Sequence, residues 1–218
     1  MKEEIIPAQA DKTLFILGPS LAMLTACMTG VVIPWGNSLI INGREYMMQI
    51  TDVNIGILYV FGVVSIGVYG IMIGGWASNN KFAFLGSLRA IAQLLSYEVF
   101  MGLSLMGAVL LAGSFNLSAI VDAQQHQWFV VPQFFGFLGF FMAGLAEAHR
   151  TPFDMPEAEA ELVAGYHSEY SGMKFGMFFV GEYLSILLLS AMTVILFFGG
   201  WHGPWLPPVV WFIVKMAA

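Results

Sequence analysis

Three glutamates interrupt stretches of the sequence that are otherwise almost wholly apolar. Glu98, Glu147 and Glu182 each lie inside a run that is long enough to cross a membrane. A carboxylate that faces lipid costs a few kcal/mol, so each side chain must face protein or water. Carboxyl groups joined by water can pass protons through a membrane. The alternative is that the three glutamates pair with neighbouring helices and serve packing specificity.

The helical rise places these glutamates at different depths. At about 1.5 Å per residue, Glu147 lies roughly 5 Å, Glu182 about 12 Å and Glu98 around 20 Å inside the span ends at one membrane face. Lys174 shares a helical stripe with Glu182, whereas Arg89 and Glu98 point to opposite sides of one helix. We therefore expect a ladder of carboxyl groups, with Arg89 and Lys174 as charged support.

The composition indicates that the segments that hold these glutamates are surrounded by lipid. The 218 residues are 58% hydrophobic and 10% charged, and the mean hydropathy is +0.78. Backbone hydrogen bonds must be satisfied inside each apolar run, and the runs lack the alternation of barrel strands. The fold class is therefore all-α, a polytopic transmembrane helical bundle. The single cysteine, Cys27, excludes an intrachain disulfide and an iron-sulfur cluster held by this chain alone.

Five full spans and a partial sixth are predicted within a single integral membrane domain, 1–218. The last run is too short to reach the other leaflet, so we expect the sequence to be truncated there. Gly70 and Gly74 in the second span form a small-residue surface that lets helices approach closely. The predicted spans are 12–34, 54–77, 84–112, 132–150, 171–198 and the partial 208–218.

Basic residues predict the orientation of the bundle, because they are enriched in cytoplasmic loops. Arg44 lies in a loop of one membrane face, and the other basic residues before residue 200 flank the opposite face. The N-terminus and the loop 151–170 are therefore predicted to be cytoplasmic. The basic residues on this face are Lys2, Lys12, Lys81, Arg89, Arg150 and Lys174.

The predicted cytoplasmic loop 151–170 is strongly acidic and holds much of the formal net charge of -6. Asp154 and Glu157 fit a capping box that starts a short helix, which Gly165 would stop. Ordinary helix-start chemistry is therefore the alternative explanation for the acidic residues. These residues are Asp154, Glu157, Glu159, Glu161 and Glu169.

Several segments carry a resemblance to a known family. The longest, 147–174, begins Glu-Ala-His-Arg-Thr-Pro-Phe-Asp-Met-Pro-Glu, and the others are 75–81, 85–98, 181–183 and 198–201. Together they resemble the H subunit of NADH-quinone oxidoreductase, the respiratory complex I subunit 1 family, over nearly the whole chain. Members of that family are longer at both ends, and they begin with an additional span.

The resemblance implies a membrane subunit that couples quinone reduction to proton translocation. Glu98, Glu147 and Glu182 would form the proton path. Quinone would be the substrate, no cofactor would be bound by this chain, and FMN and iron-sulfur clusters would belong to partner subunits. The implied location is the bacterial inner (plasma) membrane, with lipid and the other subunits as partners. The residues that would line or support the quinone chamber are Arg150, Asp154, Glu157, Glu159, Glu161 and Glu169.

Three other functions remain open from the sequence. A membrane subunit of a related hydrogenase or formate hydrogenlyase complex would share the bundle and the acidic loop, although the detailed loop match favours the quinone enzyme. An ion transporter would also hold buried acids, but no inverted repeat supports it. An inert anchor for a peripheral enzyme would lack acids deep in its spans, unlike Glu98 and Glu182.

Overall fold

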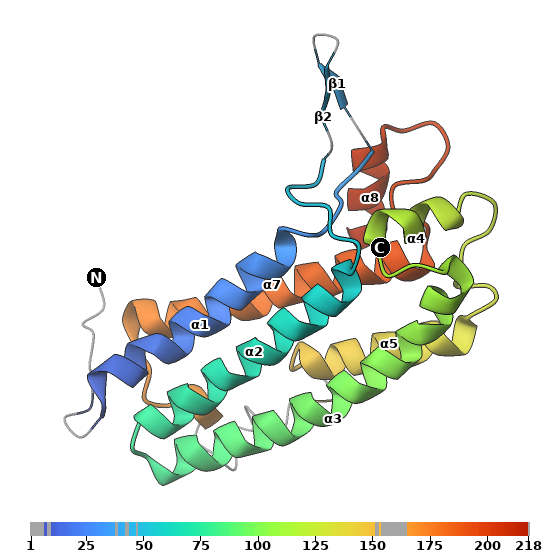
Figure 1. Cartoon of the computed structure of the whole chain (residues 1–218). Coiled ribbons are helices and arrows are strands. Elements are labelled where there is room, and N and C mark those ends of the chain that lie inside the picture. The colour runs from blue at the N-terminus through green and yellow to red at the C-terminus, as the bar shows by residue number, and fades with distance from the viewer. Residues whose placement is uncertain are drawn as a thin grey trace. The chain divides into compact units, whose positions relative to one another are not determined.

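The computed structural model describes residues 7, 10–37, 39–41, 44–46, 48–150, 153 and 165–217. The described chain is mainly helical (Figure 1), which confirms the predicted helical bundle. A short antiparallel hairpin, in which Leu39 pairs with Tyr46, was not predicted. The elements are α1 (Lys12–Gly30), β1 (Leu39–Ile41), β2 (Arg44–Tyr46), α2 (Gly56–Ala77), α3 (Lys81–Ala112), α4 (Leu117–Ala123), α5 (Phe134–Glu147), the 3-10 helix η1 (Gly165–His167), α7 (Gly172–Phe197) and α8 (Pro208–Ala217).

Four of these helices are long and apolar enough to cross a membrane: α1, α2, α3 and α7. The third span begins earlier than predicted, because the Asn80 side chain accepts a hydrogen bond from Phe82 N and caps the helix start. The helix of the fourth predicted span has only 14 residues, a length of about 21 Å. Pro132 precedes it, and His149 follows it with a left-handed φ of 48°.

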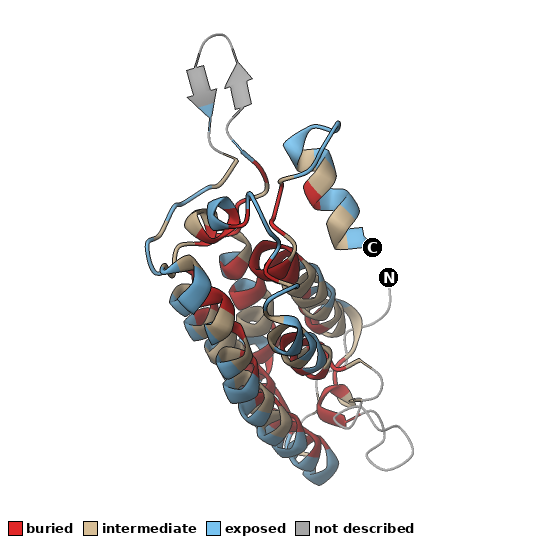
Figure 2. Ribbon diagram, turned by 90° about the vertical axis from the view of Figure 1, so that its right-hand side faces the viewer, coloured by how far each residue is buried: buried red, intermediate tan, exposed pale blue. Residues whose placement is uncertain are grey.

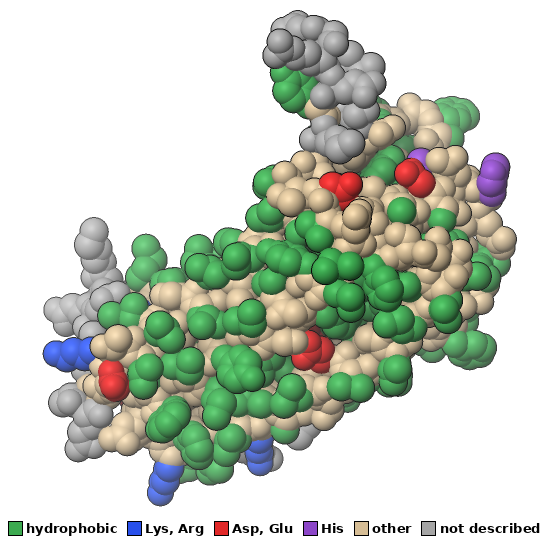
Figure 3. Space-filling view, in the orientation of Figure 1, with side chains coloured by type: hydrophobic (Ala, Val, Ile, Leu, Met, Phe, Trp, Pro, Cys, Tyr) green, Lys and Arg blue, Asp and Glu red, His purple; other side chains and the backbone are tan. Residues whose placement is uncertain are grey.

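The chain packs as two compact units. Unit 1 comprises Met1–Cys27, Gly62–Val99 and Ala143–Ser185, and unit 2 comprises Met28–Phe61, Phe100–Met142 and Ile186–Ala218. Buried and exposed residues lie on different sides of the same helices (Figure 2). Hydrophobic side chains are prominent on the face that Figure 3 shows, as expected for helices that meet lipid.

In unit 1, α1 and α2 touch through glycines. A Cβ added at Gly70 would lie 2.9 Å from the carbonyl oxygen of Gly18, and one added at Gly18 would lie 2.9 Å from Cα of Gly74. A Cβ at Gly67 would likewise lie 2.9 Å from the Thr25 hydroxyl. These contacts agree with the close helix approach that the glycine spacing predicts. They hold α2 firmly where it carries residues of the site described below.

Replacing Gly70 by alanine is expected to destabilise the protein by about 1–3 kcal/mol, because backbone atoms of α1 cannot move aside for the new Cβ. Gly62 is the matched control, since it lies on the same helix and a Cβ there would meet no neighbouring atom within 4 Å. Gly62→Ala is expected to leave stability unchanged or raise it by about 0.5–1 kcal/mol. Thermal unfolding of the detergent-solubilised protein measures both, and equal midpoints for the two variants would contradict the close contact.

In unit 2, the side chains of Gln124 and Lys215 form hydrogen bonds with the backbone at and after the end of α7. Gln124 Nε2 donates to Ile195 O at 2.8 Å, while its Oε1 accepts from Gly199 N at 3.0 Å. The Lys215 ammonium donates to the carbonyl oxygens of Phe198, Gly200 and His202 at 2.7, 3.0 and 2.7 Å. Carbonyl groups at and beyond the end of a helix have no partner within the helix, so in an apolar environment they need such hydrogen bonds. The short helix α4 begins after the N-cap residue Asn116 and ends before Gln124. It therefore positions Gln124 for these hydrogen bonds, a structural role that hydropathy did not predict.

Candidate functional site

Glu98 lies on α3 in unit 1 and is partly buried. The Ser65 hydroxyl on α2 donates a hydrogen bond to Glu98 Oε1. A carboxyl group on a membrane helix thus has a polar neighbour on another helix, as the cost of facing lipid requires. The structure therefore identifies α2 as the helix that meets Glu98, which the helical angles of α3 alone did not show.

Glu147 is the last residue of α5. Its Oε2 atom is buried and has no hydrogen-bond partner among the described residues. The carboxyl group also lies within electrostatic reach of Glu98. Buried polar atoms are usually hydrogen-bonded, so an exception needs a functional or structural explanation. Glu98 and Glu147 are therefore a candidate pair of acids on two different helices.

Arg150 connects the end of α5 to α7. The backbone turns at His149, and Arg150 N donates to Leu145 O at 3.0 Å. Arg150 Nη2 then lies 3.5 Å from Oε1 of Glu182, whose side chain is 13% exposed. The guanidinium also lies 5.3 Å from the centroid of the Tyr183 ring, within the range of a cation–π contact. A predicted loop residue and a predicted proton-path residue are therefore in direct contact.

A second contact holds the beginning of the acidic loop against α3. Gln93 Nε2 donates to Ala146 O at 3.0 Å and to Phe153 O at 2.8 Å. The Tyr97 ring packs edge-on against the Phe153 ring, with 5.1 Å between their centroids. The same helix that carries Glu98 thus fixes the end of α5 and the first part of the loop.

The other end of the loop is anchored on α2 and on the turn that joins α2 to α3. Asn80 Nδ2 donates to Glu169 Oε1 at 2.6 Å, and the Tyr170 hydroxyl donates to Gly74 O at 3.1 Å. Burial raises the pKa of the Tyr170 phenol, so the hydroxyl stays a hydrogen-bond donor at physiological pH. The Tyr170 ring stacks on Phe15 of α1, with centroids 4.0 Å apart.

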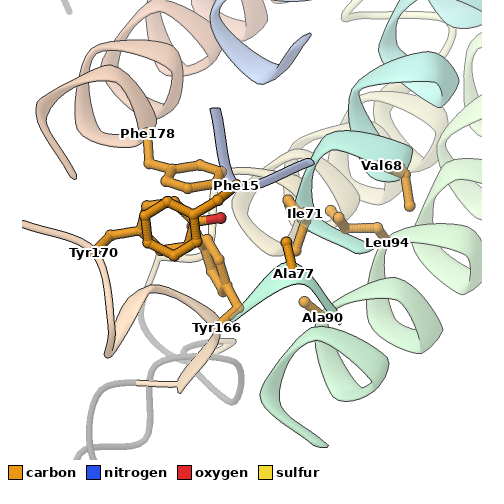
Figure 4. Close-up of a cluster of buried hydrophobic side chains, with 9 residues drawn as sticks. All are labelled: Phe15, Val68, Ile71, Ala77, Ala90, Leu94, Tyr166, Tyr170 and Phe178. Atoms are coloured by element: carbon orange, nitrogen blue, oxygen red, sulfur yellow. The ribbon is translucent and has the colours of Figure 1, made fainter. Parts of the chain in front are cut away.

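These anchoring contacts belong to the buried core of unit 1. Figure 4 shows the aromatic rings of the core gathered together, with aliphatic side chains from α2 and α3 beside them. Aromatic residues bury large areas and prefer such stacked or edge-on contacts. The core therefore positions the loop end relative to α1, α2, α3 and α7. Its residues are Phe15, Val68, Ile71, Ala77, Ala90, Leu94, Tyr166, Tyr170 and Phe178.

The structure describes some of the predicted site residues but not all of them. Among the predicted supports, Arg89 is exposed and Lys174 is buried. No group of three His, Cys, Asp or Glu side chains among the described residues could hold a metal ion. The predicted chamber residues Asp154, Glu157, Glu159 and Glu161, and the helix predicted to start at Asp154, lie outside the described residues.

Sequence reasoning missed the roles of two neutral polar residues. Ser65 is an isolated hydroxyl in an apolar helix, and such a residue often bonds its own backbone instead of a neighbour. Helical angles put Gln93 on a polar face of α3 but give it no partner. Both could have been identified as amide or hydroxyl groups in long apolar runs, because such a group needs a hydrogen-bond partner within the protein.

Comparison with known proteins gives the family. A family model described as NADH dehydrogenase matches residues 1–218. The chain is 55% identical over 217 residues to H subunit 1 of the NADH-quinone oxidoreductase of Geobacter metallireducens, covering 100% of the chain and 66% of that protein. It is 55% identical to the H subunit of Methylococcus capsulatus over 98% of the chain and 65% of the relative. For H subunit 1 of Cytophaga hutchinsonii the values are 54%, 94% and 60%.

The chain thus spans 60 to 66% of the length of these curated relatives. The family match nevertheless covers every residue of the chain. It agrees with the apolar spans and with the loop sequence that first indicated the resemblance. This chain therefore belongs to the NADH dehydrogenase family, and its similarity within that family is to the proteins named as H subunits of NADH-quinone oxidoreductase.

Proposed function

We propose that this chain is the membrane subunit of a proton-translocating NADH-quinone oxidoreductase, where it forms part of the quinone chamber and couples quinone reduction to proton movement. The observation that carries the proposal is the arrangement of acids in unit 1. Glu98 acts electrostatically on Glu147, and Glu182 contacts Arg150, the residue directly before the acidic loop. Carboxyl groups on membrane helices and the described ends of the acidic loop thus belong to one unit.

The chemistry of quinone explains why such an arrangement would be useful. Reduction of a quinone to a quinol takes up two electrons and two protons. The electrons would arrive from an iron-sulfur cluster held by a partner subunit, and this chain would bind neither that cluster nor FMN. The arrival of electrons creates negative charge, which nearby ionisable groups can sense and neutralise by giving up protons. The acidic loop would meet this charge first.

Within this scheme, the loop and the spans have different tasks. Arg150 directly precedes the loop and Glu169 lies near its end, and the segment between them would line or support the quinone chamber. Its acids Asp154, Glu157, Glu159 and Glu161 are part of this proposal. Glu98, Glu147 and Glu182 would continue the path into the membrane. The N-terminal end of α1 and the loop would face the bacterial cytoplasm, with lipid and the other subunits of the complex as partners.

Membranes that lack this subunit test the proposal. They are expected to lose NADH-driven proton translocation and the associated quinone reduction, and expression of the full-length chain is expected to restore both. Hydrogen evolution measured in the same membranes distinguishes the related hydrogenase complexes. Unchanged NADH-driven translocation, or an isolated protein that transports ions without iron-sulfur partners, would contradict the assignment.

A further inference from the structure

A hydroxyl group on α2 meets the acid pair of the proposed proton path. Ser65 donates a hydrogen bond to Glu98 Oε1, and the Glu98 carboxyl group acts electrostatically on Glu147. The three groups come from α2, α3 and α5, and all three lie in unit 1. Ser65 is thus a neutral polar group in direct contact with one member of the pair.

The backbone that carries Ser65 is held firmly. Gly67, two residues further along α2, packs so closely that a Cβ there would lie 2.9 Å from the Thr25 hydroxyl of α1. Gly70 has a similarly short approach to the backbone of α1. Site residues on rigid, well-packed helices keep their geometry better than residues on loops. The Ser65 hydroxyl is therefore presented to Glu98 from a fixed position.

The other member of the acid pair is also held from α3. Gln93 Nε2 donates to the carbonyl oxygen of Ala146, the residue before Glu147. The same amide donates to Phe153 O at the start of the acidic loop. Gln93 thus fixes the backbone beside Glu147, while Ser65 contacts the carboxyl group of Glu98. Two neutral side chains therefore define how the acids on α3 and α5 are arranged.

A hydroxyl suits this position because it serves both forms of a carboxyl group. It donates a hydrogen bond to an ionised carboxylate, and by rotating it can accept one from a protonated carboxylic acid. An ammonium or guanidinium group could only donate, and its charge would favour the ionised acid. A serine can therefore hydrogen-bond a neighbouring carboxyl group in either protonation state.

We propose that Ser65 is a positioning residue of the proton path, whose hydroxyl holds the Glu98 carboxyl group in place for proton exchange with Glu147 in both of its protonation states. This inference rests on the proposed function and adds to it a residue that carries no charge. It assigns the task to the hydroxyl group and not to the volume of the side chain. Threonine and valine, which have nearly the same shape, separate these two properties.

The test compares Ser65→Val with Ser65→Thr in the assembled complex, with full-length chain in membrane vesicles. Ser65→Val is expected to lower the kcat of NADH-driven quinone reduction and the rate of proton translocation about tenfold, since a hydrogen bond to a charged group is lost. The KM for quinone is expected to stay the same. Ser65→Thr is expected to keep both rates within about twofold, since the hydroxyl remains.

A double variant distinguishes an error in the role of Ser65 from an error in the proposed function. If Ser65 acts through Glu98, then Ser65→Val added to Glu98→Gln is expected to change the remaining rate less than about twofold. Full translocation by Glu98→Gln alone would contradict the proposed function. A normal rate in Ser65→Val, together with a loss in Glu98→Gln, would overturn only the role of Ser65. Ser65→Ala replaces the valine variant if that variant does not assemble, and a normal rate for it would count equally against the inference.

Discussion

Replacing Glu147 by glutamine is expected to lower NADH-driven proton translocation by about tenfold or more, since a positioned group that transfers a proton contributes roughly 10²- to 10⁴-fold to a rate. Glutamine has the shape of glutamate, but it cannot take up and release a proton. The buried Oε2 atom of Glu147 has no hydrogen-bond partner among the described residues. A neutral amide at this site is therefore expected to leave the subunit assembled.

Asp122 provides the matched control for this variant. It is an exposed carboxylate in unit 2, 3.7 Å from His202, and it has no role in the proposed path. Asp122→Asn makes the same change from acid to amide and is expected to keep the translocation rate within about twofold, as surface substitutions usually have small effects. Proton uptake by membrane vesicles on addition of NADH measures both variants. Equal rates in the two variants would remove Glu147 from the path.

Replacing Arg150 by methionine is expected to lower quinone reduction about tenfold. The change removes the ionic contact with Glu182 at 3.5 Å and the contact with the Tyr183 ring. The Arg150 side chain is 43% exposed, so solvent screens the pair, and we expect a loss of about 1 kcal/mol in the contact itself. The further loss comes from displacement of the loop end that follows Arg150, because small misplacements of reacting groups are costly.

Arg150→Lys separates charge from geometry at this position. Lysine keeps the positive charge but has no planar guanidinium, so it loses much of the contact with the Tyr183 ring. Its rate of quinone reduction is expected to lie between those of the unmodified protein and Arg150→Met. Steady-state assays in membranes with equal amounts of assembled complex measure the three rates. A methionine variant as active as the lysine variant would show that the charge next to Glu182 is not needed.

The membrane bundle could be predicted from the sequence because the hydrophobic effect acts on whole segments. Each long apolar run became a helix, and α1, α2, α3 and α7 lie close to the predicted limits. Local chemistry set the differences at the ends. The Asn80 cap moved the start of α3 forward, and the turn at His149 ended α5 early. Hydropathy is averaged over many residues, so it cannot predict the effect of a single hydrogen bond or backbone turn.

The candidate site could be predicted only in part. A charged residue in an apolar run is costly if it faces lipid, so Glu98, Glu147 and Glu182 could be proposed as site residues from the sequence. Their partners depend on which helices pack together, and helical periodicity describes one helix at a time. The contacts of Ser65 and Gln93 therefore became visible only in the structure, where the parts of α2, α3 and α5 that make them lie in unit 1.

Infrared difference spectroscopy of the assembled complex can show whether Glu98 and Glu147 exchange protons, because it detects carboxyl groups that gain or lose protons when quinone is reduced. We expect carboxyl difference bands that Glu147→Gln or Glu98→Gln removes and that Asp122→Asn leaves unchanged. Difference bands that remain the same in all three variants would show that these two glutamates do not exchange protons during quinone reduction.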